Sequence, residues 1–270
     1  MLDHQRYLSD AEAKEMICEI GRRVYNKNFV AANDGNISIK VGSNEIWATP
    51  TGVSKGFMTP DMLVKVDLTG KVLDGKLKPS SELKMHLRVY LENEETTAVV
   101  HAHPQAATAY AMAGVALDHA YSPEGVILLG KVPVSPYAAP GTQEVPDSIA
   151  PFCKDYNAVL LANHGALTWG RDAIEAYYRM ESLEHYSLTL LHTKKITDQL
   201  EELSAERLAE LIQIRESMGI KTGGSLISRE EALKLGEHNK PHEPSSAQVD
   251  QKLIQSIVAQ VTERVLKQLQ

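Results

Sequence analysis

The sequence predicts an α/β protein, because stretches typical of helices alternate with short apolar runs typical of strands. The runs at 98–100 and 158–162 are aliphatic and partly β-branched, as buried strands prefer. The stretches at 9–26 and 79–93 repeat apolar residues every three or four positions, which indicates helices with one buried face. A further long helix is expected over 172–195.

The N-terminal half is expected to contain one helix and then several short strands. Ser9 and Glu12 have the spacing of a capping box, which predicts where the first helix begins. Four strands, separated by turns rich in Asn, Asp, Gly and Pro, are expected at 36–40, 45–49, 62–67 and 71–73. The next helix opens at Pro79-Ser80-Ser81-Glu82, where hydroxyls and a carboxylate suit the exposed amides of a first turn.

The C-terminal half continues this alternation around the second buried strand. Residues 114–140 contain many Gly and Pro residues and two apolar runs, 126–129 and 132–134, which suggest strands and loops. The strand at 157–162 runs into His164-Gly165 and is expected to resume at 167–169. Helices complete this half, at 105–112, 143–153 and 205–217.

Beyond Gly219 the composition changes. A short helix is expected at 228–235, and the Pro- and Ser-containing stretch after it is typical of a flexible tether. Residues 247–269 then place apolar side chains four positions apart, as an amphipathic helix does. We therefore expect one domain over 1–236, a flexible linker over 237–246 and a tethered amphipathic helix over 247–270.

Composition excludes some partners. The formal net charge of −7 argues against nucleic-acid binding. Two cysteines, Cys18 and Cys153, indicate a reducing compartment without a disulfide framework. The sequence has no apolar leader and no run long enough to span a membrane, so a cytoplasmic protein is expected.

Three histidines are candidate metal ligands. His101 and His103 are two positions apart on a strand, so both side chains leave the same face. His164 follows another buried strand, before a glycine. Together they fit a three-histidine site with an open position, which suits Zn²⁺ best, although cobalt or manganese could replace it. The alternative is that all three are ordinary histidines with hydrogen-bonded rings.

An acid and several phosphate-binding elements accompany the histidines. Glu82, if it lies near the metal without binding it, would serve as a proton-transfer group. The helix start at Ser80-Ser81 and the turns around Asn36 and Thr51-Gly52 could hold a phosphate, or could simply cap a helix and turn the chain. Dinucleotide-binding, P-loop and serine-hydrolase glycine motifs are absent from the sequence.

These motifs together resemble the class II aldolase/adducin family. They occur in the family's order: Gly35-Asn36-x-Ser38, Thr49-Pro-Thr-Gly52, Ser80-Ser81-Glu82, His101-x-His103 and Asn163-His164-Gly165. The resemblance covers about 8–235. It implies a three-layer α/β fold, in which helices flank a central, mainly antiparallel sheet, with Zn²⁺ on His101, His103 and His164.

The resemblance also implies roles for the other motif residues. Glu82 matches the family's acid/base glutamate. The family aldolases are usually homotetramers with sites at subunit interfaces, where a neighbouring chain supplies a tyrosine. Tyr121 is our candidate for that tyrosine, and His119 is its rival. The residues that match the family's phosphate site are Asn36, Thr51, Gly52, Ser80 and Ser81.

The implied activity is reversible aldol cleavage of a sugar phosphate. L-fuculose 1-phosphate or L-rhamnulose 1-phosphate would give dihydroxyacetone phosphate and L-lactaldehyde through a metal-stabilised enediolate. A pentulose-5-phosphate 4-epimerase of the same family is the alternative, but such epimerases carry His-Thr-His-Ser where this chain has His101-Ala-His-Pro104. A phosphothioribulose dehydratase and a non-catalytic adducin-like interaction module are further alternatives.

The tethered helix at 247–270 lies beyond the family's usual end. It resembles the encapsulation peptides of enzymes housed in bacterial microcompartments, which implies a shell protein as partner and a location inside the compartment. The alternatives are an oligomerisation helix and a helix on a membrane surface. The polar face is rich in Gln and poor in Lys and Arg, which disfavours the membrane.

Overall fold

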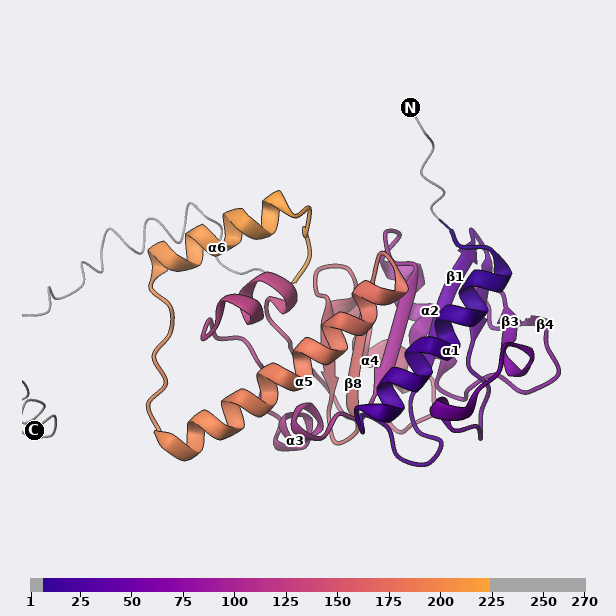
Figure 1. Cartoon of the computed structure of the whole chain (residues 1–270), viewed down its shortest axis with the longest axis horizontal. Coiled ribbons are helices and arrows are strands. Elements are labelled where there is room, and N and C mark those ends of the chain that lie inside the picture. Colours follow the sequence, from indigo (N-terminus) through magenta and orange to yellow (C-terminus); the bar gives the residue numbers. More distant parts are fainter. Residues whose placement is uncertain (1–6, 224–270) are drawn as a thin grey trace, which may run out of the picture.

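The computed structural model describes residues 7–223, which form an α/β domain around one sheet (Figure 1). The strand order is β4-β3-β2-β1-β5-β8-β7-β6. Within the described residues, neighbouring strands run antiparallel except for β6 and β7, which are parallel. The strands are β1 (Asn36–Gly42), β2 (Glu45–Ala48), β3 (Val64–Val66), β4 (Val72–Asp74), β5 (Ala98–Ala102), β6 (Val134–Ser135), β7 (Ala158–Leu161) and β8 (Gly165–Gly170).

Helices cover both faces of this sheet, so the expected three-layer, mainly antiparallel α/β fold is confirmed. One face packs against α1 (Asp10–Asn26), α3 (Gln105–Ala113) and α5 (Ala173–Ile196). The other face packs against α2 (Leu83–Glu92) and α4 (Glu144–Cys153). Figure 1 shows α1 and α5 crossing the near face of the sheet. The last described helix, α6 (Ala205–Ser217), packs on residues around 120–126.

The alternation of side chains along β5 decides which layer the histidines face. Val100 packs with the α1/α3/α5 layer, whereas Val99 packs with the α2/α4 layer. Because side chains alternate along a strand, His101 and the following His103 share the face of Val99. The metal candidates therefore point toward the layer that begins with α2.

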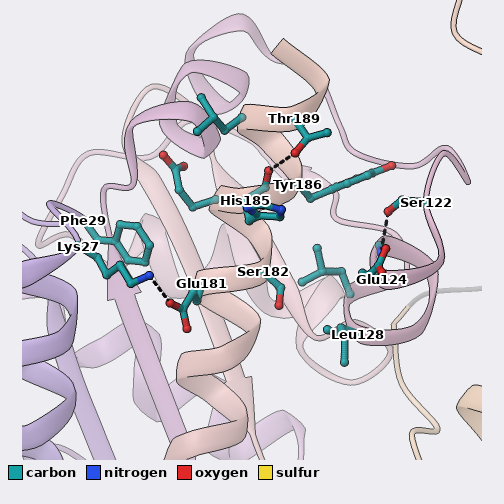
Figure 2. A pocket seen from close by; sticks show the side chains of 14 residues that line it. Lys27, Phe29, Ser122, Glu124, Leu128, Glu181, Ser182, His185, Tyr186 and Thr189 are labelled. Carbon is teal, nitrogen blue, oxygen red and sulfur yellow. Dashed lines mark hydrogen bonds and ion pairs between the residues drawn. The ribbon is translucent and has the colours of Figure 1, made fainter. Parts of the chain in front are cut away.

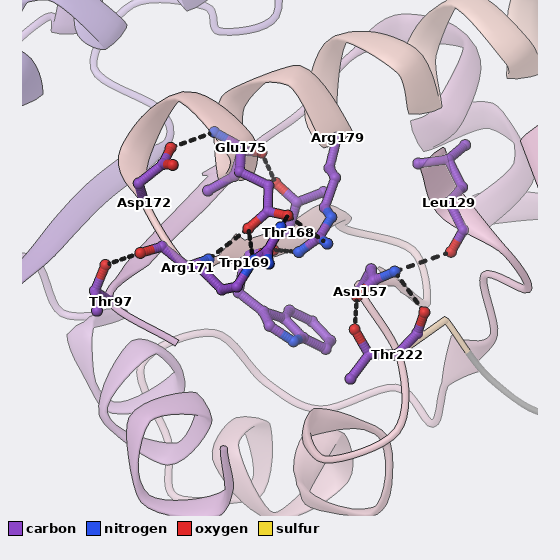
Figure 3. Close-up of polar contacts among 11 residues, drawn as sticks. Thr97, Leu129, Asn157, Thr168, Trp169, Arg171, Asp172, Glu175, Arg179 and Thr222 are labelled. Atoms are coloured by element: carbon purple, nitrogen blue, oxygen red, sulfur yellow. Dashed lines mark hydrogen bonds and ion pairs between the residues drawn. The ribbon is translucent and has the colours of Figure 1, made fainter. Parts of the chain in front are cut away.

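A polar network holds the opposite ends of β5 and β8 (Figure 3). The Thr97 hydroxyl donates to the Arg171 carbonyl oxygen over 2.6 Å. Arg179 donates to the Trp169 carbonyl oxygen over 2.6 Å, and the Glu175 carboxylate accepts from both Arg171 and Arg179. These contacts tie the start of α5 to the end of β8, which helps to fix the pairing of β8 with β5 that aligns the histidine ends.

The apolar run at 126–129 is helical, so the expectation of a strand or loop there was wrong. Residues Gly125–Leu129 form a π-helical turn, η3, whose start is held by the Ser122 hydroxyl accepting from the Gly125 amide. Val126 packs against α6, and Leu129 packs in the core under α5. A short apolar run can be buried either as a strand or as a helical turn, so periodicity alone does not distinguish the two structures.

The capping box at Ser9 and Glu12 is confirmed. None of the helices in residues 7–223 is long and apolar enough to cross a membrane. The expected helix at 228–235, the linker at 237–246 and the helix at 247–270 lie outside the described residues.

Candidate active site

His101, His103 and His164 come together at one end of the sheet. His101 lies on β5, His103 follows that strand, and His164 occupies the turn between β7 and β8. One ligand nitrogen from each ring lies within 4.8 Å of the other two. The ring centroids are 4.8 to 5.0 Å apart. The structure thus brings His164 next to His101 and His103, although 63 positions of sequence separate it from His101.

Two motif glycines allow this convergence. A Cβ atom on Gly165 would lie 2.5 Å from Cδ2 of His103, so a larger residue would displace that ring. Gly35 has a φ of +75°, and a Cβ there would lie 2.9 Å from the His101 carbonyl oxygen. Both glycines are explained by close packing against the histidine strand, in addition to any ligand.

The hydrogen bonds of the rings leave nitrogen lone pairs directed inward. His101 Nδ1 lies 2.9 Å from the Ala166 carbonyl oxygen, which can only accept, so Nδ1 carries the proton and Nε2 is free to ligate. His103 Nδ1 lies 3.5 Å from the Asp34 carboxylate. The Nε2 atoms of His101 and His103 are 3.1 Å apart, a separation at which two lone pairs repel unless a proton or cation lies between them.

The protonation state also suits a metal. Burial lowers the pKa of His101 to about 3 and lowers that of His103 as well. His101 is therefore neutral at physiological pH, as a metal ligand must be. Three convergent imidazoles, two of them with a carbonyl or carboxylate at the outer nitrogen, fit a divalent cation.

Glu82 reaches the same point from the other side. It stands immediately before α2, at the N-cap position, where its side chain makes no capping hydrogen bond. Its Oε1 lies 3.1 Å from His164 Nε2, and its Oε2 lies 3.5 Å from His101 Nε2. Burial alone would raise the pKa of Glu82, but the hydrogen bonds from His164 and Asn36 outweigh it and hold that pKa below its usual value. Glu82 is thus an ionised, largely buried carboxylate against the three imidazoles.

A buried chain of hydrogen bonds leads away from Glu82. Asn36 Nδ2 donates to Glu82 Oε2 over 2.7 Å, and Asn36 Oδ1 lies 2.6 Å from His86 Nε2. His86 Nδ1 lies 2.8 Å from the Ser38 hydroxyl, which lies 2.8 Å from the Tyr90 hydroxyl. Asn36 and His101 are also direct partners in the pairing of β1 with β5.

The direction of every bond in this chain is fixed by Glu82. A carboxylate only accepts, so Asn36 must present its NH₂ to Glu82 and its carbonyl oxygen to His86. His86 then donates from Nε2 and accepts at Nδ1 from Ser38. Burial lowers the pKa of His86 to about 3, which keeps the ring neutral and able to do both. The chain therefore holds the Asn36 amide in the one orientation that supports the Glu82 carboxylate.

A polar cavity of about 260 Å³ opens onto this cluster. The turn carrying Thr51 meets the start of α2, because the Thr51 amide donates to the Lys78 carbonyl oxygen over 3.0 Å and the Ser80 amide donates to that of Thr49 over 3.1 Å. All five residues expected to hold phosphate line the cavity together with Glu82, His103 and His164; they are Asn36, Thr51, Gly52, Ser80 and Ser81.

Tyr121 and His119 do not line this cavity. Their rings stack on each other at 5.3 Å, and His119 Nδ1 lies 2.7 Å from the Glu202 carboxylate. Tyr121 packs at the edge of the core beside Tyr110 and Tyr186. In a single chain neither residue is part of the site, so a role for either would require a second copy.

A larger hollow of about 670 Å³ lies elsewhere, between α5 and η3 (Figure 2). Two of its charged groups pair with each other, because Lys27 Nζ lies 2.7 Å from the Glu181 carboxylate. Glu184 accepts from the amides of Ala106 and Ala107 at the start of α3. The smaller cavity has the convergent, ionisable groups that chemistry needs, so it is the candidate active site.

A model of a known protein family matches more than half of this chain. Residues 15–191 match the family model described as the Class II Aldolase and Adducin N-terminal domain. The chain belongs to this family. The relatives of this chain include class II aldolases, which are metal-dependent lyases, and the three-histidine group supplies a site for the metal, so this chain is an enzyme of that type.

Individual relatives carry two different activities. An L-fuculose phosphate aldolase of Methanococcus maripaludis is 37% identical over 62% of this chain and 89% of its own length. A 3-oxo-tetronate 4-phosphate decarboxylase of Pectobacterium atrosepticum is 32% identical over 75% of this chain and 94% of its own length. The solved structure of an L-fuculose 1-phosphate aldolase is 26% identical, with a TM-score of 0.72, over 79% of this chain and 99% of that one.

Two residues near the site were not identified from the sequence. His86 follows Glu82 by four positions, which places both on one side of a helix, and that spacing was the available signal. Lys55 lines the cavity, but a lysine in a turn is usually a solvated residue, so no local pattern distinguished it.

Proposed function

We propose that the protein is a zinc-dependent aldolase that reversibly cleaves L-fuculose 1-phosphate or L-rhamnulose 1-phosphate to dihydroxyacetone phosphate and L-lactaldehyde. The observation that carries this proposal is the Glu82 carboxylate, 3.1 and 3.5 Å from nitrogens of His164 and His101. An ionised base beside a three-histidine group is the arrangement needed to form and quench negative charge next to a carbonyl.

The side chains around the cavity have separate roles in the proposed reaction. Glu82 moves the proton at the carbon that separates from the aldehyde, and Asn36 keeps its carboxylate aimed. A divalent cation, when bound by the three histidines, polarises the substrate oxygens and offsets the charge that develops during cleavage. Zn²⁺ is the cation that neutral imidazoles favour. The phosphate binds among Thr51, Gly52, Ser80 and Ser81, with Asn36 at the edge nearest Glu82.

A second activity is supported by the relatives named as 3-oxo-tetronate 4-phosphate decarboxylases. Loss of CO₂ from a 3-oxo acid also leaves negative charge beside a carbonyl, so the same cluster would serve. A pentulose-5-phosphate 4-epimerase would use the site in the same way. These reactions differ in the products they release and not in the residues described above.

A substrate panel separates these activities. We expect L-fuculose 1-phosphate or L-rhamnulose 1-phosphate to give dihydroxyacetone phosphate with a kcat/KM at least about tenfold above that for any other compound tested. The other compounds are a pentulose 5-phosphate, with epimer formation as readout, and a 3-oxo-tetronate 4-phosphate, with CO₂ release as readout. Faster CO₂ release would show that the protein is a decarboxylase and not an aldolase, and faster epimer formation would show that it is an epimerase.

The active enzyme is proposed to be a homotetramer in which the neighbouring chain completes the site. Tyr121 lies outside the cavity of its own chain, as a residue that acts in trans would. Its rival, His119, is already engaged by Glu202. We therefore retain Tyr121 as the second proton-transfer group, supplied to an adjoining copy.

The tail at 247–270 is proposed to be an encapsulation peptide that docks on a microcompartment shell protein. The support is its amphipathic pattern after a tether, beyond the residues 15–191 that match the family model. The division into a domain at 1–236, a linker at 237–246 and this tail is part of the same proposal.

A fusion experiment tests the tail. Residues 240–270 fused to a fluorescent protein should form foci in cells that produce shells and should be diffuse in cells that do not. A tail with charged residues replacing Ile257 and Val261 is the matched control and should be diffuse in both. A diffuse wild-type fusion in shell-producing cells would contradict the proposal, and foci without shells would indicate self-association.

A further inference from the structure

Lys55 is almost completely buried beside the cavity, and the proposed chemistry does not use it. It opens the short 3₁₀ helix η1 (Lys55–Phe57), and only 1% of its surface is exposed. It lines the same cavity as Glu82, His103 and His164. Lysine is among the residues least often buried to this degree unless its charge is paired.

The ammonium group of Lys55 joins two loops of the site. Its Nζ donates to the Asn33 carbonyl oxygen over 2.8 Å and to the Val53 carbonyl oxygen over 2.6 Å. Asn33 precedes the turn that leads into Asn36, and Val53 follows Thr51-Gly52. These two hydrogen bonds require a donor at position 55. They do not require a positive charge there, because neutral donors also bond to carbonyl oxygens.

The charge of Lys55 has no carboxylate at ion-pair distance in the described part of the chain. Burial lowers the pKa of Lys55 to about 8, while Asp34 and Glu82 act at longer range in the opposite direction. Because that value lies above neutral pH, most of the population is protonated at pH 7. An ammonium ion removed from water and bonded only to neutral groups is costly to keep, which suggests that a ligand uses it.

The charges around the cavity indicate which kind of ligand this is. Lys55 is the one Lys or Arg side chain among the described residues that line the cavity, and the lining carboxylates are those of Asp34 and Glu82. The other residues expected to contact a phosphate are neutral. A phosphate monoester carries about −1.5 to −2 charges at pH 7, so it needs a nearby cation in this acidic setting.

We propose that Lys55 supplies the positive charge that binds the substrate's phosphate and makes the site selective for phosphorylated sugars over free sugars. The same side chain holds the Asn33 and Thr51-Gly52 loops in place. One residue therefore provides the positive charge and also positions the loops that contact the phosphate. This inference rests on the proposed function, because it assumes that the ligand of the cavity is a sugar phosphate.

Three variants of the holoenzyme test it. Lys55→Gln keeps an N–H donor without the charge, and Lys55→Arg keeps the charge. Lys65→Gln is the control, because Lys65 lies outside the cavity and pairs with Asp10 and Glu45. Lys55→Gln should raise the KM for the sugar 1-phosphate and the inhibition constant of inorganic phosphate about 10- to 100-fold, the range for one charge-assisted hydrogen bond, with a much smaller change in kcat. Lys55→Arg should recover part of the phosphate affinity that Lys55→Gln loses, because it keeps the charge, and Lys65→Gln should stay close to wild type.

A structural role alone would give another pattern. Loosened loops would lower kcat/KM for the free sugar as much as for its phosphate, whereas a charge partner affects only the phosphate. Unchanged inhibition by phosphate in folded Lys55→Gln would overturn the Lys55 proposal while leaving the proposed function intact. If wild-type enzyme binds neither inorganic phosphate nor any sugar phosphate, the proposed function itself fails.

A measurement on unaltered protein keeps the test valid if Lys55→Gln does not fold. With lysine labelled by ¹³C at Cε, the Lys55 resonance, assigned through Lys55→Arg, should shift as inorganic phosphate is added. The Lys65 resonance should stay where it is. A Lys55 resonance that does not respond to saturating phosphate would overturn the proposal.

Discussion

Replacing Glu82 by glutamine should leave the protein folded and able to bind metal, but it should lower kcat about 100- to 10,000-fold, the usual loss for a general acid–base group. Glutamine has the same shape and can still meet Asn36, yet it cannot accept a proton. The Glu82 carboxylate contacts His164 and His101 through its two oxygens. The substitution therefore removes the group that accepts the substrate proton and leaves both histidines in place. Metal content and single-turnover cleavage of the sugar phosphate are the measurements.

Two further variants make the result specific to this carboxylate. Glu181→Gln changes a carboxylate that pairs with Lys27 in the other hollow, and it should keep wild-type turnover. His86→Leu should lower kcat less than Glu82→Gln does, because it frees the Asn36 amide to rotate without removing the base. Combining His86→Leu with Asn36→Ala should cost little beyond Asn36→Ala alone, since His86 acts through Asn36. Near-normal turnover in Glu82→Gln would refute its role as the base.

The layers of the fold and the histidine cluster were predictable because each rests on a strong local pattern. Alternation along β5 is enough to put His101 and His103 on one face, and the structure confirms that they converge with His164. The apolar runs of β5 and β7 identify buried strands, and β5 lies at the centre of the sheet. By contrast, the apolar run at 126–129 is compatible with a strand and with a helical turn. Its packing against α5 and α6 determines that it forms a helical turn.

The support around the cluster was not predictable, because it depends on which strands are neighbours. His86 meets Asn36 only because β1 pairs with β5 and α2 lies on the face that both strands present. Lys55 is buried only because the Asn33 and Val53 carbonyl oxygens converge on it from two loops. The contribution of Tyr121 depends on a second copy of the chain, which a single sequence does not position.

Replacing His103 by alanine should weaken metal binding more than about 100-fold, beyond the 10- to 100-fold loss expected when only a hydrogen-bond partner of a ligand is removed. His103 supplies one of three nitrogens, and its Nε2 lies 3.1 Å from that of His101. Two imidazoles do not complete a tetrahedral site with one open position. Metal content after dialysis and the Kd for Zn²⁺ measured by competition with a chelator are the readouts.

Stability provides an independent readout for the same variant. A metal held at 100 times its Kd stabilises the folded state by about 2.7 kcal/mol, so a chelator should lower the melting temperature of the wild type but not of His103→Ala. Asp34→Asn, which alters only the carboxylate 3.5 Å from His103 Nδ1, should lose the smaller 10- to 100-fold in affinity. His185→Ala removes an exposed histidine of the other hollow and should behave as wild type. A chelator-sensitive melting temperature retained in His103→Ala would contradict the proposal that His103 is a required metal ligand.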